Sequence, residues 1–256
     1  MSYNGKQNGN GFGTFSGRPI EGQSGRTYYA TDTQGFYYDD GYTWKMIGPT
    51  KNLIAPKISD FTKINYSATD CAFNNLIGGG INMSRFSTGS SENIFAAVQA
   101  VPYTPYQLTV HLRWEATSAI WGGSNPGQSM MGLCFRESSS GKMAVMRFGN
   151  GNGVNSTLDS GVRYFSDPNT LHLDLAEWSG LPAMLTPPLW MRIQDDGTNR
   201  IYWISGSGQK TVWTPLYEES NTSYLTADQV GFYINPYGSS SNITVVSFEF
   251  SDVIET

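Results

Sequence analysis

The acidic residues that could carry out acid–base chemistry are few and unfavourably spaced. A retaining glycosidase needs two carboxyl groups about 5 Å apart, usually at alternate positions of one strand. The nearest candidates are Asp174 with Glu177, which differ in parity along a strand, and the neighbours Glu218 and Glu219 in an expected loop. Both pairs are predicted to be solvated surface charges, so we expect no catalytic residue and no enzymatic activity.

Metal and cofactor sites are not indicated either. The two histidines, His111 and His172, lie far apart and have no Cys or His at ligand spacing, which disfavours structural zinc. Asp195, Asp196 and Asn199 could chelate calcium through their oxygens, but a polar hairpin turn explains these residues equally well. We therefore predict no cofactor and assign no metal ligand.

Aromatic rings beside amide and carboxylate groups would suit the binding of a sugar. Such sites use exposed rings for the apolar face of the sugar and Asp, Asn or Arg for its hydroxyl groups. Each aromatic residue could instead pack at the base of a loop or in a contact between subunits. The candidate glycan-binding residues are Trp121, Asn125, Tyr164, Trp178, Asn235 and Tyr237. Further polar partners are Asp167, Asn169 and Asn242.

The elements that must position these residues are predicted to be β-strands. The chain of 256 residues contains 29 Gly, 15 Tyr, 13 Phe and 7 Trp, and only 14% of its residues are charged. An average protein has about 25% charged residues, and a helical protein would need more Ala, Leu, Glu and Lys. This composition is typical of an all-β protein with many tight turns.

The charge pattern excludes several partners. The net charge is −5, from 16 basic and 21 acidic residues, and no basic cluster is present, so nucleic-acid binding is not expected. No window approaches the roughly 18 apolar residues of a membrane-spanning helix, and membrane insertion is not expected. The segment MSYNGKQNGNGFGTFSG lacks the features of a secretory signal. Cys71 and Cys134 do not by themselves define a disulfide, and a buried free thiol is expected at Cys134.

Apolar alternation predicts a series of strands from residue 51 onward. Residues 189–194 alternate, a polar turn follows at 195–199, and the chain returns as the second strand of a hairpin. In Ile243–Phe250 the apolar parity changes, so a β-bulge near Val245-Val246 would keep the apolar residues facing the core. Residues 171–178 fit either a short helical turn or a strand. Earlier and intervening strands are predicted at Phe95–Ala100, Gln107–Trp114, Met130–Glu137, Lys142–Phe148, Gly161–Phe165 and Gln229–Asn235.

Residues 17–49, GRPIEGQSGRTYYATDTQGFYYDDGYTWKMIGP, form an attachment-like module. Their three apolar runs, Arg26–Ala30, Gln34–Tyr38 and Tyr42–Ile47, are separated by turn residues and predict a small antiparallel meander. The order of Gly-Arg-Pro, Gly-Arg, Ala-Thr-Asp-Thr, Asp-Gly and Trp resembles a module of tailed-bacteriophage virion proteins, although a generic β-module is the alternative. The residues that the resemblance implies for attachment are Arg18, Pro19, Arg26, Asp32 and Trp44.

A second resemblance concerns the rest of the chain. The segment WMRIQDDGTNRIYWISGSG at 190–208, followed by Trp213–Leu216 and Val230–Asn235, is similar to part of the concanavalin A-like jelly roll of lectins and glucanases. The resemblance implies one two-sheet sandwich over residues 51–256, after a boundary at Gly48-Pro49-Thr50. Residues 1–16, rich in Gly and Asn, are expected to be an arm that is flexible or ordered by a partner.

These observations predict an all-β protein in which a small N-terminal β-meander precedes a concanavalin A-like jelly-roll β-sandwich. The functional hypothesis is a non-enzymatic bacteriophage virion protein of a tail fibre, baseplate or capsid decoration, synthesised in the host bacterial cytoplasm. Its expected partners are other virion proteins, further copies of itself in a homotrimer, and a bacterial surface glycan. A polysaccharide-degrading virion enzyme and a structural spacer without ligand are the alternatives.

Overall fold

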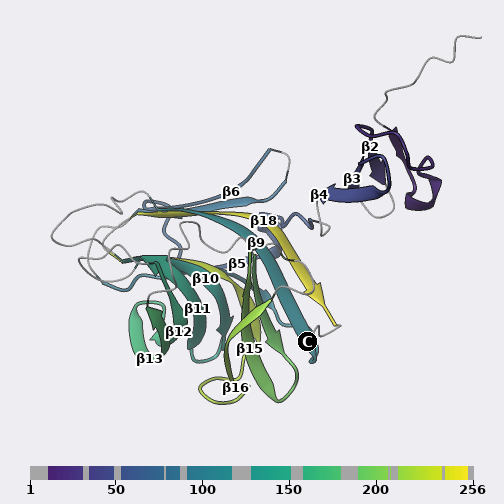
Figure 1. Ribbon diagram of the computed structural model, residues 1–256. Helices are drawn as coiled ribbons and strands as arrows, with labels where there is room; N and C mark the ends of the chain where they lie inside the picture. The colour runs from purple at the N-terminus through teal and green to yellow at the C-terminus, as the bar shows by residue number, and fades with distance from the viewer. Residues whose placement is uncertain are drawn as a thin grey trace, which may run out of the picture. The chain divides into compact units, whose positions relative to one another are not determined.

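The chain divides into two compact units, Met1–Leu53 and Ile54–Thr256. The structure, a computed structural model, is shown in Figure 1. It describes residues 11–30, 35–48, 53–77, 79–86, 91–116, 128–150, 158–179, 190–206, 208, 213–237 and 240–252.

The N-terminal unit is a four-stranded sheet with the strands in sequence order. It contains β1 (Gly11–Gly13), β2 (Thr27–Ala30), β3 (Gly35–Asp39) and β4 (Trp44–Gly48), with a 3₁₀ turn at Phe15–Gly17. Strands β2 to β4 form the predicted antiparallel meander.

Strand β1 was not predicted and pairs with β2 in parallel. It lies within the segment expected to be an arm, and that expectation is wrong for Gly11–Gly13. The strand can form here because Gly11 has no Cβ. A Cβ at this position would lie 2.8 Å from the ring of Tyr28, so only glycine lets the strand pass so close to that ring.

The larger unit is a sandwich of two seven-stranded antiparallel sheets. From edge to edge, the front sheet contains β13 (Thr170–Ser179), β12 (Leu158–Asp167), β11 (Met143–Asn150), β10 (Gln128–Arg136), β17 (Gln229–Tyr237), β8 (Phe95–Ala100) and β5 (Thr62–Ile64). The back sheet contains β16 (Thr214–Ser220), β15 (Asn199–Ser205), β14 (Trp190–Asp195), β9 (Tyr106–Ala116), β18 (Ser241–Ser251), β7 (Ile81–Arg85) and β6 (Cys71–Asn75). A 3₁₀ turn at Ile58–Asp60 precedes β5. The all-β class and the two-sheet jelly-roll sandwich are confirmed.

The main core lies between the two sheets and is rich in aromatic rings. Phe61 contacts Phe232 of the front sheet and Phe248 of the back sheet edge-on, with ring centroids 5.1 and 5.0 Å away. Full burial of one such side chain stabilises the fold by about 1.5–3 kcal/mol. The sandwich is therefore held together chiefly by apolar burial between its sheets.

The outer face of the front sheet is buried as well. Cys134, Met143 and Val145 are inaccessible to solvent on this face, in a second small core. Register shifts along the β12–β13 pair bend this hairpin, and the strands β10 to β13 are visibly curved in Figure 1. The carbonyl of Pro168, in the turn of that hairpin, accepts a 2.8 Å hydrogen bond from the N–H of Ile94. The hairpin thus reaches across the face to the start of β8.

Two predictions about individual strands were resolved. Residues 171–178 lie in β13 and form a strand rather than a helical turn. The β-bulge in β18 is confirmed, as the register shifts between Val245 and Ser247. Val246 is the extra residue and is only half-buried, so it does not join the core as expected.

Candidate functional site

A cluster of charged side chains surrounds the guanidinium of Arg163. Its Nε donates a short hydrogen bond to Oδ1 of Asp174 on the neighbouring strand. Its Nη1 lies 3.7 Å from Oε1 of Glu92 and donates to the sulfur of Met130 at 3.2 Å. The side chains of Arg163 and Glu92 are 8% and 13% exposed, whereas that of Asp174 is 40% exposed. Asp174 is therefore the carboxylate of this cluster that solvent reaches most readily.

Asn235, a predicted glycan ligand, completes this group, which we call the Arg163 cluster. Its Nδ2 donates to Oε2 of Glu92, and its Oδ1 accepts a 3.0 Å hydrogen bond from the N–H of Asn93. The Asn235 side chain is fully buried. The amide nitrogen and the amide oxygen of Asn235 both bond within the protein. Asn235 therefore positions Glu92 rather than presenting itself to a ligand.

Asn65 ties the segment around Glu92 to the β12–β13 turn. Its Nδ2 donates to the Ile94 carbonyl at 2.8 Å and to Oδ1 of Asn169 at 3.0 Å. Asn65 has φ of 55°, a left-handed conformation that Asn adopts more readily than most residues. The N–H of Asn169 donates in turn to Asp167 at 2.8 Å. The predicted polar partners Asp167 and Asn169 therefore hold the hairpin in place.

The spacing of Asp174 and Glu177 was misjudged from the sequence. The backbone register pairs Asp174 with Arg163 and Glu177 with Gly161, which are two residues apart on β12. The irregularity between these pairs places both positions on one face of the sheet. The sequence argument that Asp174 and Glu177 lie on opposite faces of a regular strand therefore does not apply to β13.

The prediction for Glu219 was wrong. Glu219 lies on β16 rather than in a loop, and its side chain is 3% exposed. It lies 3.3 Å from Nη2 of the fully buried Arg200. Its carboxylate accepts hydrogen bonds from the hydroxyl of Tyr202, at 2.7 Å, and from that of Tyr164. Its neighbour Glu218 is exposed, as expected of a surface charge.

Tyr164 is not an exposed platform for a sugar. Its ring is 4% exposed and stacks on Tyr224, with centroids 4.2 Å apart. Burial raises the pKa of the Tyr164 phenol, and its hydrogen bond to Glu219 raises that pKa further. Composition and strand pattern do not distinguish such an inward aromatic residue from an outward one.

The remaining glycan candidates are only partly described. Tyr237 is half-buried at the end of β17, where it pairs with Gln128 at the start of β10. The backbone of Trp178 pairs with Ser160, but its side chain lies outside the described part of the structure. Trp121 and Asn125 also lie outside the described residues. The polar partner Asn242 lies apart from the Arg163 cluster, on β18, and accepts from Asn82 at 2.7 Å.

The oxygens that could bind calcium in the β14–β15 turn hold the turn itself. Oδ1 of Asp195 accepts from the N–H of Gly197 at 2.9 Å, and Oδ1 of Asp196 accepts from those of Thr198 and Asn199 at 2.7 and 2.6 Å. These bonds favour the interpretation as a hairpin turn. Within the described ranges, no group of three His, Cys, Asp or Glu residues is placed to hold a metal ion. In the same ranges, no helix has the length and apolarity to cross a membrane.

The residues implied for attachment form internal contacts of the N-terminal unit. The indole N–H of Trp44 donates to the Pro19 carbonyl at 2.9 Å, and the guanidinium of Arg18 lies 4.5 Å from the ring centroid of Tyr37. Arg26 forms an ion pair with Asp39. Asp32 lies outside the described residues. These contacts show how Arg18, Arg26 and Trp44 help to maintain the module.

Sequence reasoning missed Asp39, the hub of this unit. Its fully buried carboxylate accepts hydrogen bonds from Arg26 and from the backbone N–H groups of Gly22, Gln23 and Gly41. Burial alone would raise the pKa of Asp39, but these hydrogen bonds outweigh it and hold that pKa well below its usual range. The predicted hairpin could have indicated this pair, because Arg26 and Asp39 flank the paired residues Thr27 and Tyr38.

Comparisons with known proteins identify the fold but not a family. No family model matches the chain, and no curated protein sequence matches it. A functionally unknown protein from Saccharomyces cerevisiae is similar in structure, with 9% identity and a TM-score of 0.51, over 78% of this chain and 100% of that chain. The CBM2 module of the evolved Dit protein of Lactobacillus casei BL23 phage J-1 has 12% identity and a TM-score of 0.41, over 73% and 91% of the two chains. A legume lectin-like domain from Entamoeba histolytica has 10% identity and a TM-score of 0.43, over 81% and 99%.

Proposed function

We propose that this chain is a non-enzymatic bacteriophage virion protein whose larger unit binds a glycan of the bacterial surface. The observation that supports binding is the Arg163 cluster, which fixes the solvent-accessible carboxylate of Asp174 in one orientation. A carboxylate held in this way can accept two hydroxyl groups of a sugar without first losing conformational freedom. The virion assignment is supported by the resemblance of residues 17–49.

Binding is favoured over catalysis because of how the two carboxylates are paired. In a glycosidase both carboxyl groups must be free to act on the bond that is cleaved. Glu92 and Asp174 instead contact the same guanidinium. The arrangement suits recognition of hydroxyl groups, with Tyr237 on the neighbouring part of β17 as the candidate ring.

The N-terminal unit is proposed to attach the chain to other virion proteins and to further copies in a homotrimer. Its internal contacts use residues of the 17–49 motif, whereas several large apolar side chains remain exposed. Phe12, Ile20 and Tyr42 are 82%, 86% and 89% exposed. Exposed apolar side chains of this size in so small a unit are typical of a contact surface.

The binding proposal is tested with the full-length protein on an array of bacterial surface glycans. Asp174→Ala should weaken binding to the best glycan by about tenfold, the loss typical of one charge-assisted hydrogen bond. Asp60→Ala, which removes another exposed aspartate on the 3₁₀ turn before β5, is the matched control and should leave binding unchanged. Equal affinities of the Asp174→Ala and Asp60→Ala proteins would refute the site, and a wild-type protein that binds no glycan would favour the spacer alternative.

A polysaccharide-degrading enzyme is the second candidate because Asp174 and Glu177 occupy one face of the sheet. The full-length protein should produce no new reducing ends from capsular or cell-wall polysaccharide. Release of reducing ends by the wild type, abolished by both Asp174→Asn and Glu177→Gln, would replace the binding proposal with a catalytic one.

A further inference from the structure

The free edge of β6 differs from the other three sheet edges of the sandwich. Unpaired strand edges promote association between chains, and proteins usually protect them with short strands, charged residues, proline or β-bulges. Strand β5 has only three residues, one of them Lys63, and β13 has three register shifts along its pair with β12. Strand β16 contains Pro215 and pairs with β15 through a register shift. Strand β6, with the sequence CAFNN, has five residues and none of these features, so it is the edge best suited to pair with a further strand.

The main-chain groups that β6 offers at this edge follow from its hydrogen bonds to β7. The N–H of Phe86 donates to the carbonyl of Asp70, and the N–H of Leu76 donates to that of Gly80. Hydrogen-bonded and non-hydrogen-bonded pairs alternate in an antiparallel ladder, so the even-numbered residues of β6 bond to β7. The main-chain groups that point away from β7 are those of Cys71, Phe73 and Asn75.

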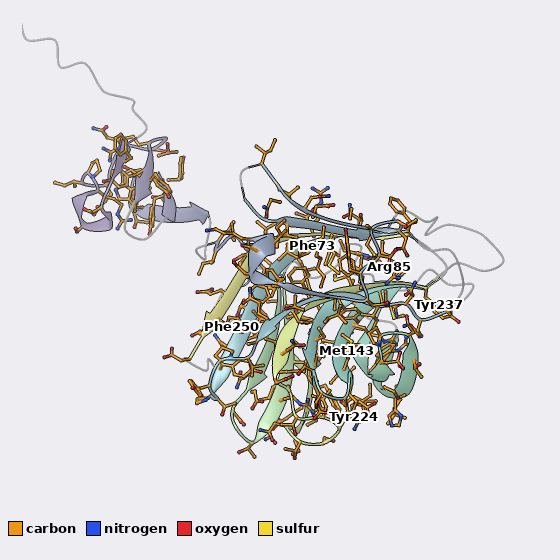
Figure 2. The ribbon with its side chains drawn as sticks, turned by 180° about the vertical axis from the view of Figure 1, so that it is seen from behind. Phe73, Arg85, Met143, Tyr224, Tyr237 and Phe250 are labelled. Atoms are coloured by element: carbon orange, nitrogen blue, oxygen red, sulfur yellow. The ribbon has the colours of Figure 1, made fainter. Side chains whose placement is uncertain are left out.

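The centre of this edge is open in the described part of the structure. The N–H of Cys71 donates to the Ser67 carbonyl at 2.8 Å, which occupies one donor. Among the described residues, no main-chain bond from outside the β6–β7 ladder reaches Phe73 or Asn75. In Figure 1, β6 runs along one margin of the larger unit, and Figure 2 shows Phe73 on the side opposite Tyr224. The edge therefore presents main-chain donors and acceptors that a further strand can use.

We propose that β6 pairs with β6 of a second copy of this chain, antiparallel and centred on Phe73. A two-fold axis at Phe73 brings its N–H and C=O opposite the same groups of the second copy. The same axis places the N–H of Asn75 opposite the C=O of Cys71, and both of these groups point away from β7. The main-chain hydrogen bonds that result are two between the Phe73 residues and two between Asn75 and Cys71.

The side chains along β6 favour a second copy over an unrelated strand. The two side chains on the outer face of the strand, Ala72 and Asn74, become cross-strand neighbours, and neither carries a charge that would repel its counterpart. The adjoining turn adds an apolar contact, because Ile77 is fully exposed. The same register brings Ile77 beside Ala68 and Thr69 of the second copy, which are exposed as well. The edge is therefore complementary to itself, as a two-fold contact requires.

The contact is expected to be weak by itself. A strand of five residues buries much less than the roughly 800 Å² per partner of a standard interface, so we expect a Kd on the order of 100 µM. Copies held side by side on one support would form it readily, because their effective concentration is in the millimolar range. The contact depends neither on glycan binding nor on the N-terminal unit.

The register is tested by cysteine cross-linking of the full-length protein. In the proposed pairing Ala72 lies directly opposite Asn74 of the second copy, whereas each of the two is displaced diagonally from its own counterpart. Directly opposite Cβ atoms are about 4.5–5.5 Å apart and diagonal ones about 7–8 Å, so only the opposite pair comes near disulfide geometry. A mixture of the Ala72→Cys and Asn74→Cys proteins, treated with oxidised glutathione, should give at least about fivefold more covalent dimer than either protein alone. The wild type, whose two cysteines are buried, gives the background, and equal yields from the mixture and the separate proteins overturn the proposal.

Analytical ultracentrifugation separates the edge contact from association through the N-terminal unit. Ala72→Lys/Asn74→Lys places lysines directly opposite each other and should weaken the concentration-dependent association of the wild type by at least about tenfold. The matched control, Thr214→Lys/Ser220→Lys, adds the same charge at exposed positions of the edge strand β16 and should behave as the wild type. Association that the β6 variant retains belongs to the N-terminal unit and overturns the proposal. A wild type that shows no such association up to about 1 mM, ten times the expected Kd, overturns it as well.

Discussion

The Arg26 guanidinium donates two hydrogen bonds to one oxygen of Asp39, at 2.5 Å from Nη2 and 3.2 Å from Nε. Among the described side chains of this unit, the apolar core consists of Tyr28, Ala30 and Tyr37, with Trp44 packed against them. So small a core supplies little stability by itself. The order of residues in the segment 17–49 therefore has a structural cause, because it brings this pair and its loop together.

Asp39→Asn should selectively destabilise the N-terminal unit. The amide cannot accept every bond that the carboxylate accepts, and Arg26 loses its counter-charge. Hydrogen exchange at the backbone N–H groups of Gly22, Gln23 and Gly41, which donate to Asp39, should accelerate by at least tenfold, while the sandwich stays protected. Asp40→Asn is the comparison, because its carboxylate accepts from Tyr42 and Thr43 and not from these three groups, so their exchange should change much less. Similar exchange in the two variants would contradict the role of Asp39 as the hub.

Acid should unfold the N-terminal unit through the same carboxylate. The pKa of Asp39 is lower in the folded unit than in the unfolded chain, so its contribution is complete above about pH 4 and is lost as the pH falls through the folded value. Asp40 adds to this trend, because the hydrogen bond from Lys45 and those from Thr43 and Tyr42 lower its pKa to about 2. Exchange measured from pH 5 down to pH 2 should show the N-terminal unit opening progressively. A unit equally protected at both ends of this range would exclude the linkage.

Glu219→Ala should destabilise the sandwich by about 3–5 kcal/mol, because it leaves the buried Arg200 without its counter-charge. Tyr164→Phe removes one donor to the same carboxylate and should cost about 1 kcal/mol. Chemical denaturation of the full-length protein measures both. The control is Glu218→Ala on the exposed side of the same strand, expected to change stability by about 0.5 kcal/mol or less. Equal effects at positions 218 and 219 would show that the buried ion pair is unimportant.

Gly231→Ala should be among the most damaging single substitutions in the front sheet. A Cβ at Gly231 would lie 2.8 Å from the Cα of Val98 on the paired strand β8, and backbone atoms cannot move away cheaply. We expect a loss of about 3 kcal/mol or more. Gly206→Ala is the matched control, because a Cβ there meets nothing within 4 Å. The midpoints of thermal unfolding compare the two variants, and similar midpoints would disprove the close packing of β17 on β8.

The sequence predicted elements better than it predicted how they bend. Alternation identified β14, β15 and β17, and the change of parity in β18 located its bulge. Strand β1 was missed because its glycines carry no apolar pattern, although their lack of a Cβ is what leaves room for the ring of Tyr28. The curl of the front sheet depends on register shifts and on the contact between Asn65 and Asn169, which are 104 residues apart.

The candidate site was predicted only in part for the same reason. Asn235 was predicted as a glycan ligand and Asp174 was expected to be only a solvated surface charge, whereas the structure brings the two together through Arg163 and Glu92. The sequence around Arg163 and Glu92 does not mark them as site residues. Arg163 is a single arginine on an apolar strand, and Glu92 is a single glutamate in a polar segment. Tyr164 was misassigned because its role depends on the distant Glu219.

The filled outer face of the front sheet restricts how any polymer can approach it. The β12–β13 hairpin reaches across this face to Ile94, and the side chains beneath it are inaccessible to solvent. A long polymer therefore cannot lie directly on these strands, because the hairpin already occupies the place that such a ligand would take. In this part of the sandwich the protein has become its own ligand, and a polymer at the proposed site would contact the hairpin and not the sheet beneath it.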